Sequence, residues 1–266
     1  MKGLQELYSA KPQLRVCAVN FLNTLPLVWG MVQGPQRGLF ELSFTTPAEC
    51  ADRLAMGQAE IGIVPSVELE RLKLDILPGA GIACRGPIRS ILLISKVAPE
   101  NIRVLAADAG SRTSVVLAQL ILANRYAVRP RLLSRPPELT AMLEEADAAV
   151  IIGDPALRLE PASLAYFTLD LGQEWLELTG LPMVFAVWAA RRQYVTAELI
   201  AAFQDSCRFG RQHLEDIVRA EASRRGIPEM LARHYLHNLL INELGEQEYR
   251  GLKVFLERAR QLGGRG

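Results

Sequence analysis

The stretch Val16-Cys17-Ala18-Val19-Asn20-Phe21-Leu22-Asn23-Thr24-Leu25-Pro26 carries the strongest signal for the fold of this chain. Its apolar first half predicts a short buried strand, which ends in a polar turn and is followed at once by a helix from Leu25 to Val32. Asn23 and Thr24 stand where the first helical turn leaves backbone N–H groups without partners. Such a turn either caps its own helix or holds a carboxylate, and the recurrence of similar turns along the chain favours a site for a small anion.

Strands and helices continue to alternate after this turn. Expected strands lie at 42–45, 61–64, 76–77, 91–94, 104–107, 131–133, 148–152 and 183–190, and expected helices lie at 47–56, 67–72, 114–127, 137–145 and beyond 196. The alternation predicts an α/β fold with a largely parallel sheet. Because a second unit begins near Pro99 and the run 183–190 leads back to the first, the expected lobes are 1–98 with 191–266, and 99–190. We expect the C-terminal helices to pack on the first lobe.

The composition is that of an ordinary globular protein. The 266 residues suffice for two cores, 50% of them are hydrophobic, and the formal net charge of +1 gives no electrostatic case for nucleic acid or an anionic membrane. The apolar runs are too short to span a bilayer, and the opening MKGLQELYSAKPQ has no apolar signal-peptide core. We therefore expect a cytoplasmic protein. The four cysteines are widely spaced and expected to be reduced, and the three histidines, all beyond residue 210, have no ligand partners that would predict a metal site.

Three further turns place polar groups after the carboxyl ends of strands, where ligands bind in open α/β sheets, and a fourth turn, 85–90, enters a buried strand. They contribute Ser66, Ser90, Asp154 and the trio Ser111, Arg112 and Thr113. Each of these turns is also a reasonable helix cap or bend when taken alone. The spacing is not that of a P-loop, and neither a Ser-His-Asp arrangement nor a histidine acid–base pair is present. Taken together, the turns predict a cleft of hydroxyls, amides and helix N-termini.

Six blocks of sequence occur in an order that resembles one known family. They are VNFLNTLPLVWG, IGIVPSVE, GPIRSILLIS, DAGSRTSVVLAQLIL, AVIIGDPAL and DLGQEWLELTGLPMVFAVW, and the later INELGEQEYRGLKVF fits the same pattern. From about Leu14 to Leu262 the chain resembles the menaquinone biosynthesis family of the futalosine route, in its chorismate dehydratase branch. Asn20 departs from the pattern, because many relatives are expected to have Ser there.

The resemblance implies both a fold and a reaction. The fold is the type II periplasmic-binding-protein-like fold, with two α/β lobes around a ligand cleft. The reaction is that of a carbon–oxygen hydro-lyase, which removes water from chorismate to give 3-[(1-carboxyvinyl)oxy]benzoate without a metal or organic cofactor. The sequence leaves the oligomeric state open.

Residue roles follow from this chemistry as hypotheses. Asn23 would hydrogen-bond the C4 hydroxyl of the substrate or the developing enolate, and Asp154 is a candidate general base, with a carboxylate of the substrate as the alternative base. The remaining candidates would bind substrate: Thr24, Ser66 and Ser90 from the first lobe, and Ser111, Arg112 and Thr113 from the second.

Three other classes of protein are alternatives to the dehydratase. A solute-binding protein of the same fold would work outside the cytoplasmic membrane and would need a signal peptide. The sister enzyme that forms dihydroxynaphthoate should carry a candidate catalytic histidine between the lobes. A ligand-sensing module would need a DNA-binding or signalling segment, which the sequence does not contain.

Overall fold

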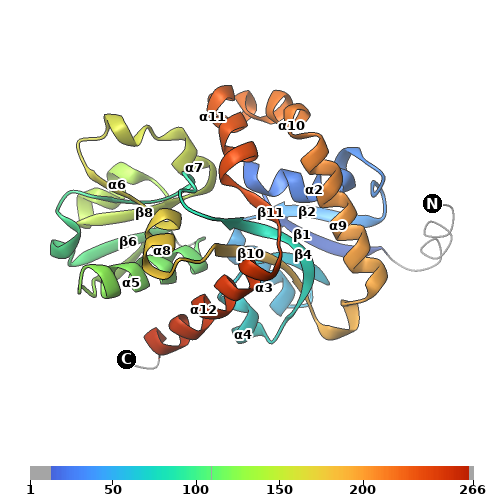
Figure 1. Ribbon diagram of the computed structural model, residues 1–266, viewed down its shortest axis with the longest axis horizontal. Helices are drawn as coiled ribbons and strands as arrows, with labels where there is room; N and C mark the ends of the chain where they lie inside the picture. Colours follow the sequence, from blue (N-terminus) through green and yellow to red (C-terminus); the bar gives the residue numbers. More distant parts are fainter. Residues whose placement is uncertain (1–12, 109, 264–266) are drawn as a thin grey trace.

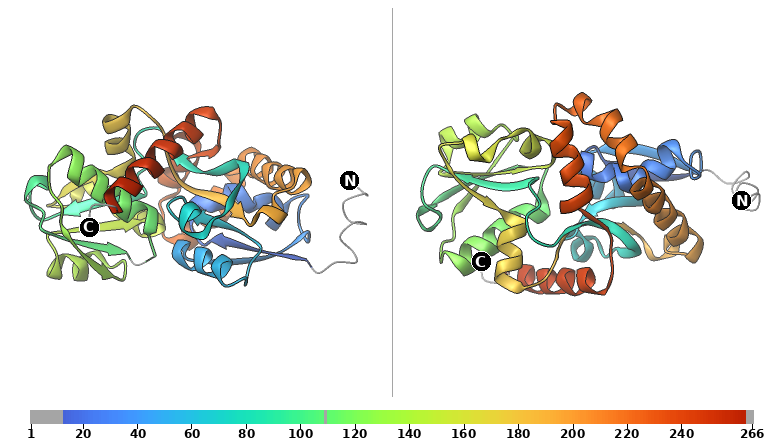
Figure 2. Two further views of the ribbon diagram at one scale, coloured as in Figure 1. Left: turned by 90° about the horizontal axis from the view of Figure 1, so that it is seen from below. Right: turned by 45° about the horizontal axis from the view of Figure 1, so that its top comes forward.

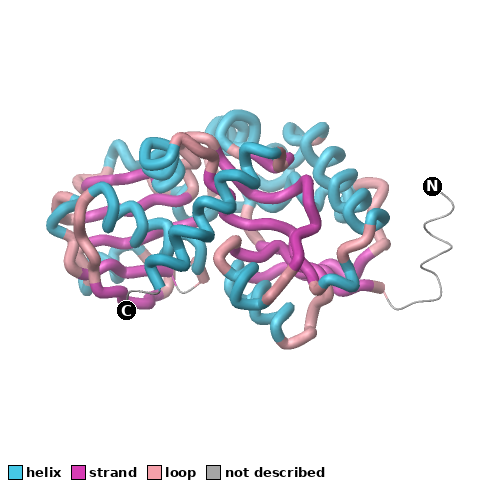
Figure 3. Tube along the Cα trace, turned by 60° about the horizontal axis from the view of Figure 1, so that its bottom comes forward, coloured by secondary structure: helices cyan, strands magenta, loops and turns pink. Residues whose placement is uncertain are grey.

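Two α/β lobes lie side by side in the computed structural model, which describes residues 13–108 and 110–263 (Figure 1). Residues 1–12 of the opening segment, for which we expect no signal peptide, lie outside these ranges. Ala109, next to the turn that contributes Ser111, Arg112 and Thr113, also lies outside them. Each lobe is built on one mixed sheet, and the two sheets are separate ladders (Figure 3). The expected two-lobe α/β fold is therefore confirmed.

The first lobe contains a six-stranded sheet. Its order is β11 (Ile241–Glu243), β4 (Asp75–Cys84), β10 (Met183–Ala190), β3 (Ile61–Pro65), β1 (Leu14–Val19) and β2 (Phe40–Thr45). β1 pairs in parallel with β2 and β3, whereas β10 runs antiparallel to both β3 and β4. The expectation of a largely parallel sheet is wrong here, because the strand that returns from the other lobe enters between β3 and β4 in the opposite direction.

The second lobe contains a five-stranded sheet. Its order is β7 (Arg131–Arg135), β6 (Val104–Asp108), β8 (Ala148–Ile152), β5 (Ile91–Ser95) and β9 (Phe167–Asp170). β6 is parallel to β7 and β8, and β5 is antiparallel to β8 and β9. Each sheet thus combines a parallel half with an antiparallel half that contains a strand adjoining a crossing between the lobes.

The chain crosses between the lobes at residues 85–90 and again at 180–182. Because β5 pairs within the second sheet and β10 within the first, both crossings come earlier in the chain than the boundaries expected near residues 99 and 190. Apolar strand sequences alone do not show to which sheet they belong, since both sheets bury such strands.

Helices flank both sheets. Those of the first lobe are α2 (Leu25–Gln33), α3 (Pro47–Ala55), α4 (Glu68–Leu72), α9 (Ala197–Gln212), α10 (Leu214–Glu221) and α11 (Glu229–His234), and those of the second are α5 (Arg112–Arg125), α6 (Leu139–Glu145), α7 (Gly153–Arg158) and α8 (Leu171–Thr179). No helix within the described ranges has the length and apolarity that crossing a membrane requires.

The last helix, α12 (Glu246–Gly263), spans the junction of the lobes (Figure 2). It packs on β10 of the first lobe and on α5 of the second, and Phe255 makes an edge-to-face contact with Trp175 of α8 at 5.9 Å between ring centroids. α12 therefore packs on the first lobe as expected and, in addition, on the second lobe, so it joins the two.

Candidate active site

A small cavity of about 50 Å³ lies between the lobes. Residues of both lobes line it: Val19, Phe21, Asn23, Pro47, Pro65, Ile82, Ile88, Ser90, Ile91, Ser111, Arg112, Thr113, Ser114, Ile152, Gly153, Phe185 and Ala186. The walls are largely apolar and the polar groups are few, as in sites that fix the orientation of a small ligand. Of the eight residues singled out from the sequence, the structure brings five to this cavity: Asn23, Ser90, Ser111, Arg112 and Thr113.

Asn23 reaches the cavity because the chain turns sharply after β1. Residues Leu22–Thr24 form a 3-10 turn that leads directly into α2, with Pro26 in the first turn of that helix. Thr24 is fully buried outside the cavity, and its hydroxyl donates to Asn23 Oδ1 at 3.4 Å. Thr24 therefore contacts Asn23 and not the cavity.

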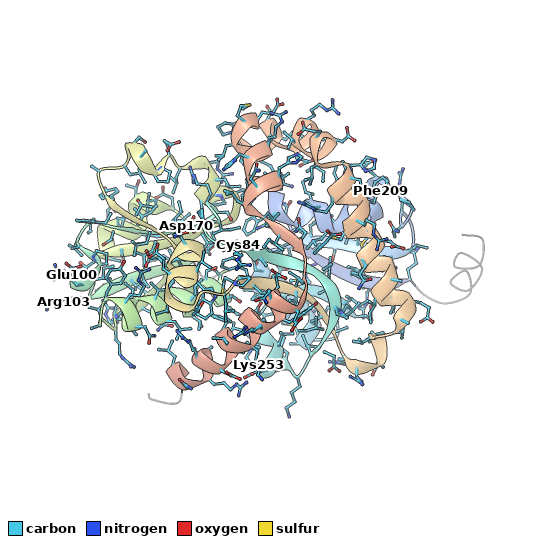
Figure 4. All side chains as sticks on the ribbon, viewed as in Figure 1. Cys84, Glu100, Arg103, Asp170, Phe209 and Lys253 are labelled. Carbon is cyan, nitrogen blue, oxygen red and sulfur yellow. The ribbon has the colours of Figure 1, made fainter. Side chains whose placement is uncertain are left out.

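Ser90 stands at the end of the first crossing segment, in a backbone that is held in place. The preceding residue, Arg89, has a φ of +66°, in the left-handed region that non-glycine residues rarely adopt. The Asp170 carboxylate fixes this conformation by accepting hydrogen bonds from the backbone N–H groups of Ile88 at 3.0 Å and Arg89 at 2.6 Å. Asp170 lies at the junction of the lobes near Cys84 (Figure 4), and burial raises the pKa of both groups.

Gly153 forms part of the cavity wall opposite β1. Its φ is +62°, and a Cβ at this position would come within 2.7 Å of the Phe21 ring. Its N–H donates to the Ser90 carbonyl at 2.7 Å. Glycine is therefore required both for the backbone conformation and for the close approach of the lobes.

The second lobe presents the N-terminus of α5 to the cavity. Ser111 is the N-cap, its side chain makes no capping hydrogen bond, and the first turn contains no acidic residue. Ser111, Thr113 and Ser114 are buried and line the cavity together. Because the helix has 14 residues, its first-turn N–H groups and its dipole favour a negative charge at this end.

Arg112 lines the cavity, but its guanidinium pairs with carboxylates of the first lobe. Nη2 lies 2.9 Å from both oxygens of Asp52 in α3, and Nη1 lies 3.3 Å from Oε2 of Glu68 in α4. Close by, Val67 N–H donates to Thr113 Oγ1 at 3.3 Å. These contacts link the lobes, but Nη1 is buried without a hydrogen-bond partner among the described residues, so it remains available to a ligand carboxylate.

Asp154 and Ser66 lie outside the residues that line the cavity. Asp154 Oδ1 accepts the Leu22 N–H at 2.9 Å, and Oδ2 pairs with Arg225 at 2.7 Å. Ser66 is fully buried, and its hydroxyl donates to the Val184 carbonyl at 2.8 Å. The contacts of Asp154 thus support a structural role better than the role of general base.

Two residues that lie outside the cavity but contact the candidate residues were not identified from the sequence. Tyr235, which is fully buried, places its hydroxyl 2.8 Å from Ser90 Oγ, and Arg225 holds Asp154. Arg225 also contacts Asn20, whose carbonyl oxygen accepts a hydrogen bond from it at 3.3 Å. Both missed residues lie in C-terminal helical turns far along the chain, and no local motif marks them.

The lining of the cavity contains few ionisable groups. Among its described residues, Arg112 is the only one with a charged side chain, and none is a histidine, cysteine, lysine or carboxylate. Within residues 13–108 and 110–263, no three His, Cys, Asp or Glu side chains are grouped so that they could hold a metal ion. The site therefore offers helix N–H groups, hydroxyls, one amide and the Nη1 group of Arg112 to a ligand.

Two α/β lobes around a small cavity define the class of periplasmic-binding-protein-like folds. A crystal structure of a protein from Archaeoglobus fulgidus superposes with a TM-score of 0.75 at 19% identity, covering 94% of this chain and 98% of that one. The periplasmic aliphatic sulphonate binding protein of Escherichia coli superposes with a TM-score of 0.63 at 13% identity, covering 94% and 88%. These similarities establish the fold.

The sequence comparisons define the family. A relative from Thermus thermophilus named chorismate dehydratase is 31% identical over 236 residues, which is 82% of this chain and 86% of its own length. The family model described as menaquinone biosynthesis matches residues 14–261. The chain belongs to this menaquinone biosynthesis family.

Proposed function

We propose that this protein is a chorismate dehydratase, which eliminates water from chorismate to give 3-[(1-carboxyvinyl)oxy]benzoate. The observation that carries the proposal is the cavity itself. It presents Asn23 and Ser90 from one side and the uncapped N-terminus of α5 from the other, in a chain whose relative in Thermus thermophilus bears that name. The reaction breaks a carbon–oxygen bond without hydrolysis, so the enzyme class is a hydro-lyase.

The charge of chorismate matches the polarity of the cavity. Chorismate is a dianion with one carboxylate on the ring and one on the enolpyruvyl group. We place the ring carboxylate at Ser111, Thr113 and Ser114, because the α5 N-terminus stabilises negative charge there. Loss of the C3 proton delocalises charge through the ring diene onto this same carboxylate. The helix N-terminus would therefore stabilise the charge that develops during the reaction as well as the bound substrate.

A carboxylate of the substrate is the base that this cavity favours. The enolpyruvyl carboxylate is attached through the ether oxygen on C3, close to the C3 proton, and the described lining supplies no competing side-chain base. The carboxylate takes the C3 proton, and the electron pair moves into the ring and towards the ring carboxylate. Holding the substrate in the reactive conformation then supplies much of the rate enhancement.

Asn23 and Ser90 are placed to assist departure of the C4 hydroxyl. The anionic intermediate expels hydroxide from C4, the ring becomes aromatic, and the hydroxide takes up the proton held by the enolpyruvyl carboxyl group to leave as water. Donation from the Asn23 amide or the Ser90 hydroxyl to the C4 oxygen stabilises the negative charge that forms there. We keep Thr24 and Ser66 as supporting residues of the first lobe, and Arg112 as the residue that joins the lobes over the bound substrate.

The cysteines support a reducing compartment, which the cytoplasm provides. All four are free and buried in the described structure, and burial raises the pKa of Cys50, Cys84 and Cys207 thiols. Protonated, buried thiols act as small apolar side chains. We therefore propose a cytoplasmic enzyme with a small-molecule substrate.

The proposal is tested by incubating the purified protein with chorismate, with no added metal or cofactor. We expect the diene absorbance to fall and mass spectrometry to detect a product lighter than chorismate by one water. A blank without protein controls for spontaneous rearrangement of chorismate, which leaves the mass unchanged. Asn23→Ala is expected to lower kcat by about 100-fold, since oxyanion-type hydrogen bonds contribute at this level.

Two results would contradict the proposal in different ways. Tight binding of chorismate without turnover would identify a binding protein of the same fold. No binding of chorismate would mean that the cavity takes a different anion. Full turnover by Asn23→Ala would leave the reaction in place but remove Asn23 from it.

A further inference from the structure

A fully buried tyrosine lies directly behind the polar wall of the cavity. Tyr235 has no exposed surface and is not among the residues that line the cavity. It begins a π-helical segment, Tyr235–Leu239, which continues from α11 and lies over the junction of the two lobes (Figure 2, right). Residues from the C-terminal region therefore reach the site from behind, although only N-terminal and central segments form its surface.

The Tyr235 hydroxyl lies beside the polar wall of the cavity. It lies 2.8 Å from Ser90 Oγ. Burial raises the pKa of the phenol overall, and the neighbouring Asn23 side chain lowers it. Ser90 and Asn23 come from segments about 70 residues apart in the chain, and Tyr235 lies next to both. Its hydroxyl supports Ser90 directly, from the side turned away from the cavity.

The backbone around Tyr235 is shaped for this position. The Leu240 N–H bonds the Tyr235 carbonyl at 3.1 Å, five residues back, where a regular α-helix would bond four residues back. Such wide turns are rare and occur frequently at functional sites. This wide turn begins at Tyr235, the residue that contacts Ser90. The turn is defined by backbone hydrogen bonds, so it is independent of the side-chain hydrogen bond between Tyr235 and Ser90.

We propose that Tyr235 is a positioning residue, which fixes the rotamer of Ser90 so that its hydroxyl faces the cavity. The inference rests on the proposed dehydratase function. Tyr235 and Ser90 each carry one hydroxyl proton and either can be the donor, so the direction of their hydrogen bond sets which way the Ser90 hydroxyl points. Removing the Tyr235 oxygen would leave Ser90 Oγ buried without this partner and free to rotate away from the substrate.

Tyr235→Phe removes only the hydroxyl and keeps the ring. We expect kcat for chorismate to fall by about 10-fold to 100-fold while KM changes by less than about 3-fold, because misdirected groups affect the transition state more than binding. Tyr249→Phe is the matched control. The Tyr249 hydroxyl accepts the Gly79 N–H at 2.7 Å, away from the cavity, so this variant loses one hydrogen bond of the fold and should keep the wild-type kcat.

Coupling to Ser90 separates positioning from a general loss of stability. If Tyr235 acts through Ser90, Tyr235→Phe combined with Ser90→Ala should be no slower than Ser90→Ala alone. Multiplicative losses in the double variant, or a kcat of Tyr235→Phe equal to that of the wild type, would overturn the inference.

A crystal structure of Tyr235→Phe tests the inference whether or not chorismate is the substrate. We expect Ser90 to adopt a different rotamer, and an unchanged Ser90 rotamer would overturn the positioning role. Absence of turnover by the wild-type protein would instead refute the dehydratase function, and the crystallographic result would still decide the role of Tyr235.

Discussion

At the scale of single residues, Asp154 holds together the turn that presents Asn23. Its carboxylate accepts the Leu22 N–H one residue before Asn23, and it pairs with Arg225, which also donates to the Asn20 carbonyl. Both side chains of the pair are largely buried, with exposed fractions of 9% for Asp154 and 14% for Arg225. The ion pair therefore links the second lobe to the turn after β1 from outside the cavity.

Asp154→Asn distinguishes this structural role from catalysis. We expect kcat to stay within about 3-fold of the wild type, whereas loss of a general base would lower it by about 100-fold to 10,000-fold. We also expect a loss of stability of about 1–3 kcal/mol, because Arg225 loses one of its two carboxylate partners and keeps only Glu221. Steady-state kinetics and thermal unfolding measure the two effects, and Asp216→Asn, which breaks an exposed pair with Arg219, serves as the control. A loss of kcat on the catalytic scale would restore Asp154 as the base.

The sequence was sufficient to predict residues whose role depends on a local turn. Asn23 and Ser111 each follow a strand and precede a helix, so their place at the strand ends could be predicted from neighbours in the chain. The orientations of Arg112 and Asp154 could not, because their partners are at positions 52, 68 and 225. A long charged side chain at a cleft pairs with whichever opposite charge the tertiary fold brings near.

At the scale of elements, the N-terminus of α5 combines an anion site with a link between the lobes. A cation at a helix N-terminus opposes the helix dipole, and Arg112 at the first position of α5 is compensated by Asp52 and Glu68. The Glu68 side chain is only 5% exposed, and Arg71 pairs with it at 2.5 Å. These charges form a closed cluster between α3, α4 and α5.

Arg112→Gln tests whether this cluster keeps the lobes closed over substrate. We expect KM to rise by about 3-fold to 10-fold with little change in kcat, because partly exposed pairs contribute modestly and Glu68 keeps Arg71. Asp52→Asn should have a similar effect, and the double variant should be no worse than either single one. If Arg112 instead binds the substrate carboxylate directly, Asp52→Asn would leave KM unchanged or lower it.

Most helices and strands were predicted where their own hydrophobic pattern was sufficient. Strands whose extent depends on pairing with neighbouring strands were missed or predicted too short. β4 runs from Asp75 to Cys84, although Pro78 and Gly79 predicted only a short strand at 76–77. The strand continues because β10 and β11 pair with it on either side. α8 was missed even though it has local signals, namely an Asp170 N-cap and Gly180 in the left-handed conformation after its last turn. β11 has three residues and is a strand only because β4 is adjacent.

At the scale of the whole molecule, the two lobes share one hydrophobic core. A single cluster of buried side chains runs from the first sheet through Leu117 and Ile121 of α5 to Trp175 of α8 and Phe255 of α12. A second, smaller cluster around Met142 is confined to the second lobe. Because α12 lies across the junction, with Lys253 on its exposed side (Figure 4), it helps to hold the lobes together in addition to the two crossing segments.

This arrangement predicts that the two lobes unfold together in one transition. It also predicts that this cooperative unfolding depends on the contact between α12 and the second crossing segment. The wild-type protein should show one calorimetric transition. Gly251 packs against this crossing so closely that a Cβ would come within 2.1 Å of the Pro182 carbonyl oxygen. Gly251→Ala should therefore displace α12 and cost about 1–3 kcal/mol, which corresponds to a fall in Tm of several degrees for a chain of this size.

Gly245→Ala provides the control for this prediction, because a Cβ there would meet only the flexible end of Glu248 at 3.4 Å. We expect it to unfold like the wild type, while Gly251→Ala melts earlier and over a broader range as the lobes lose part of their coupling. Two resolved transitions in the wild type would mean that the crossings and α12 do not make the lobes cooperative. An unchanged Tm in Gly251→Ala would mean that α12 can shift along β10 at little cost, and the helix would then be free to move as the cleft opens for substrate.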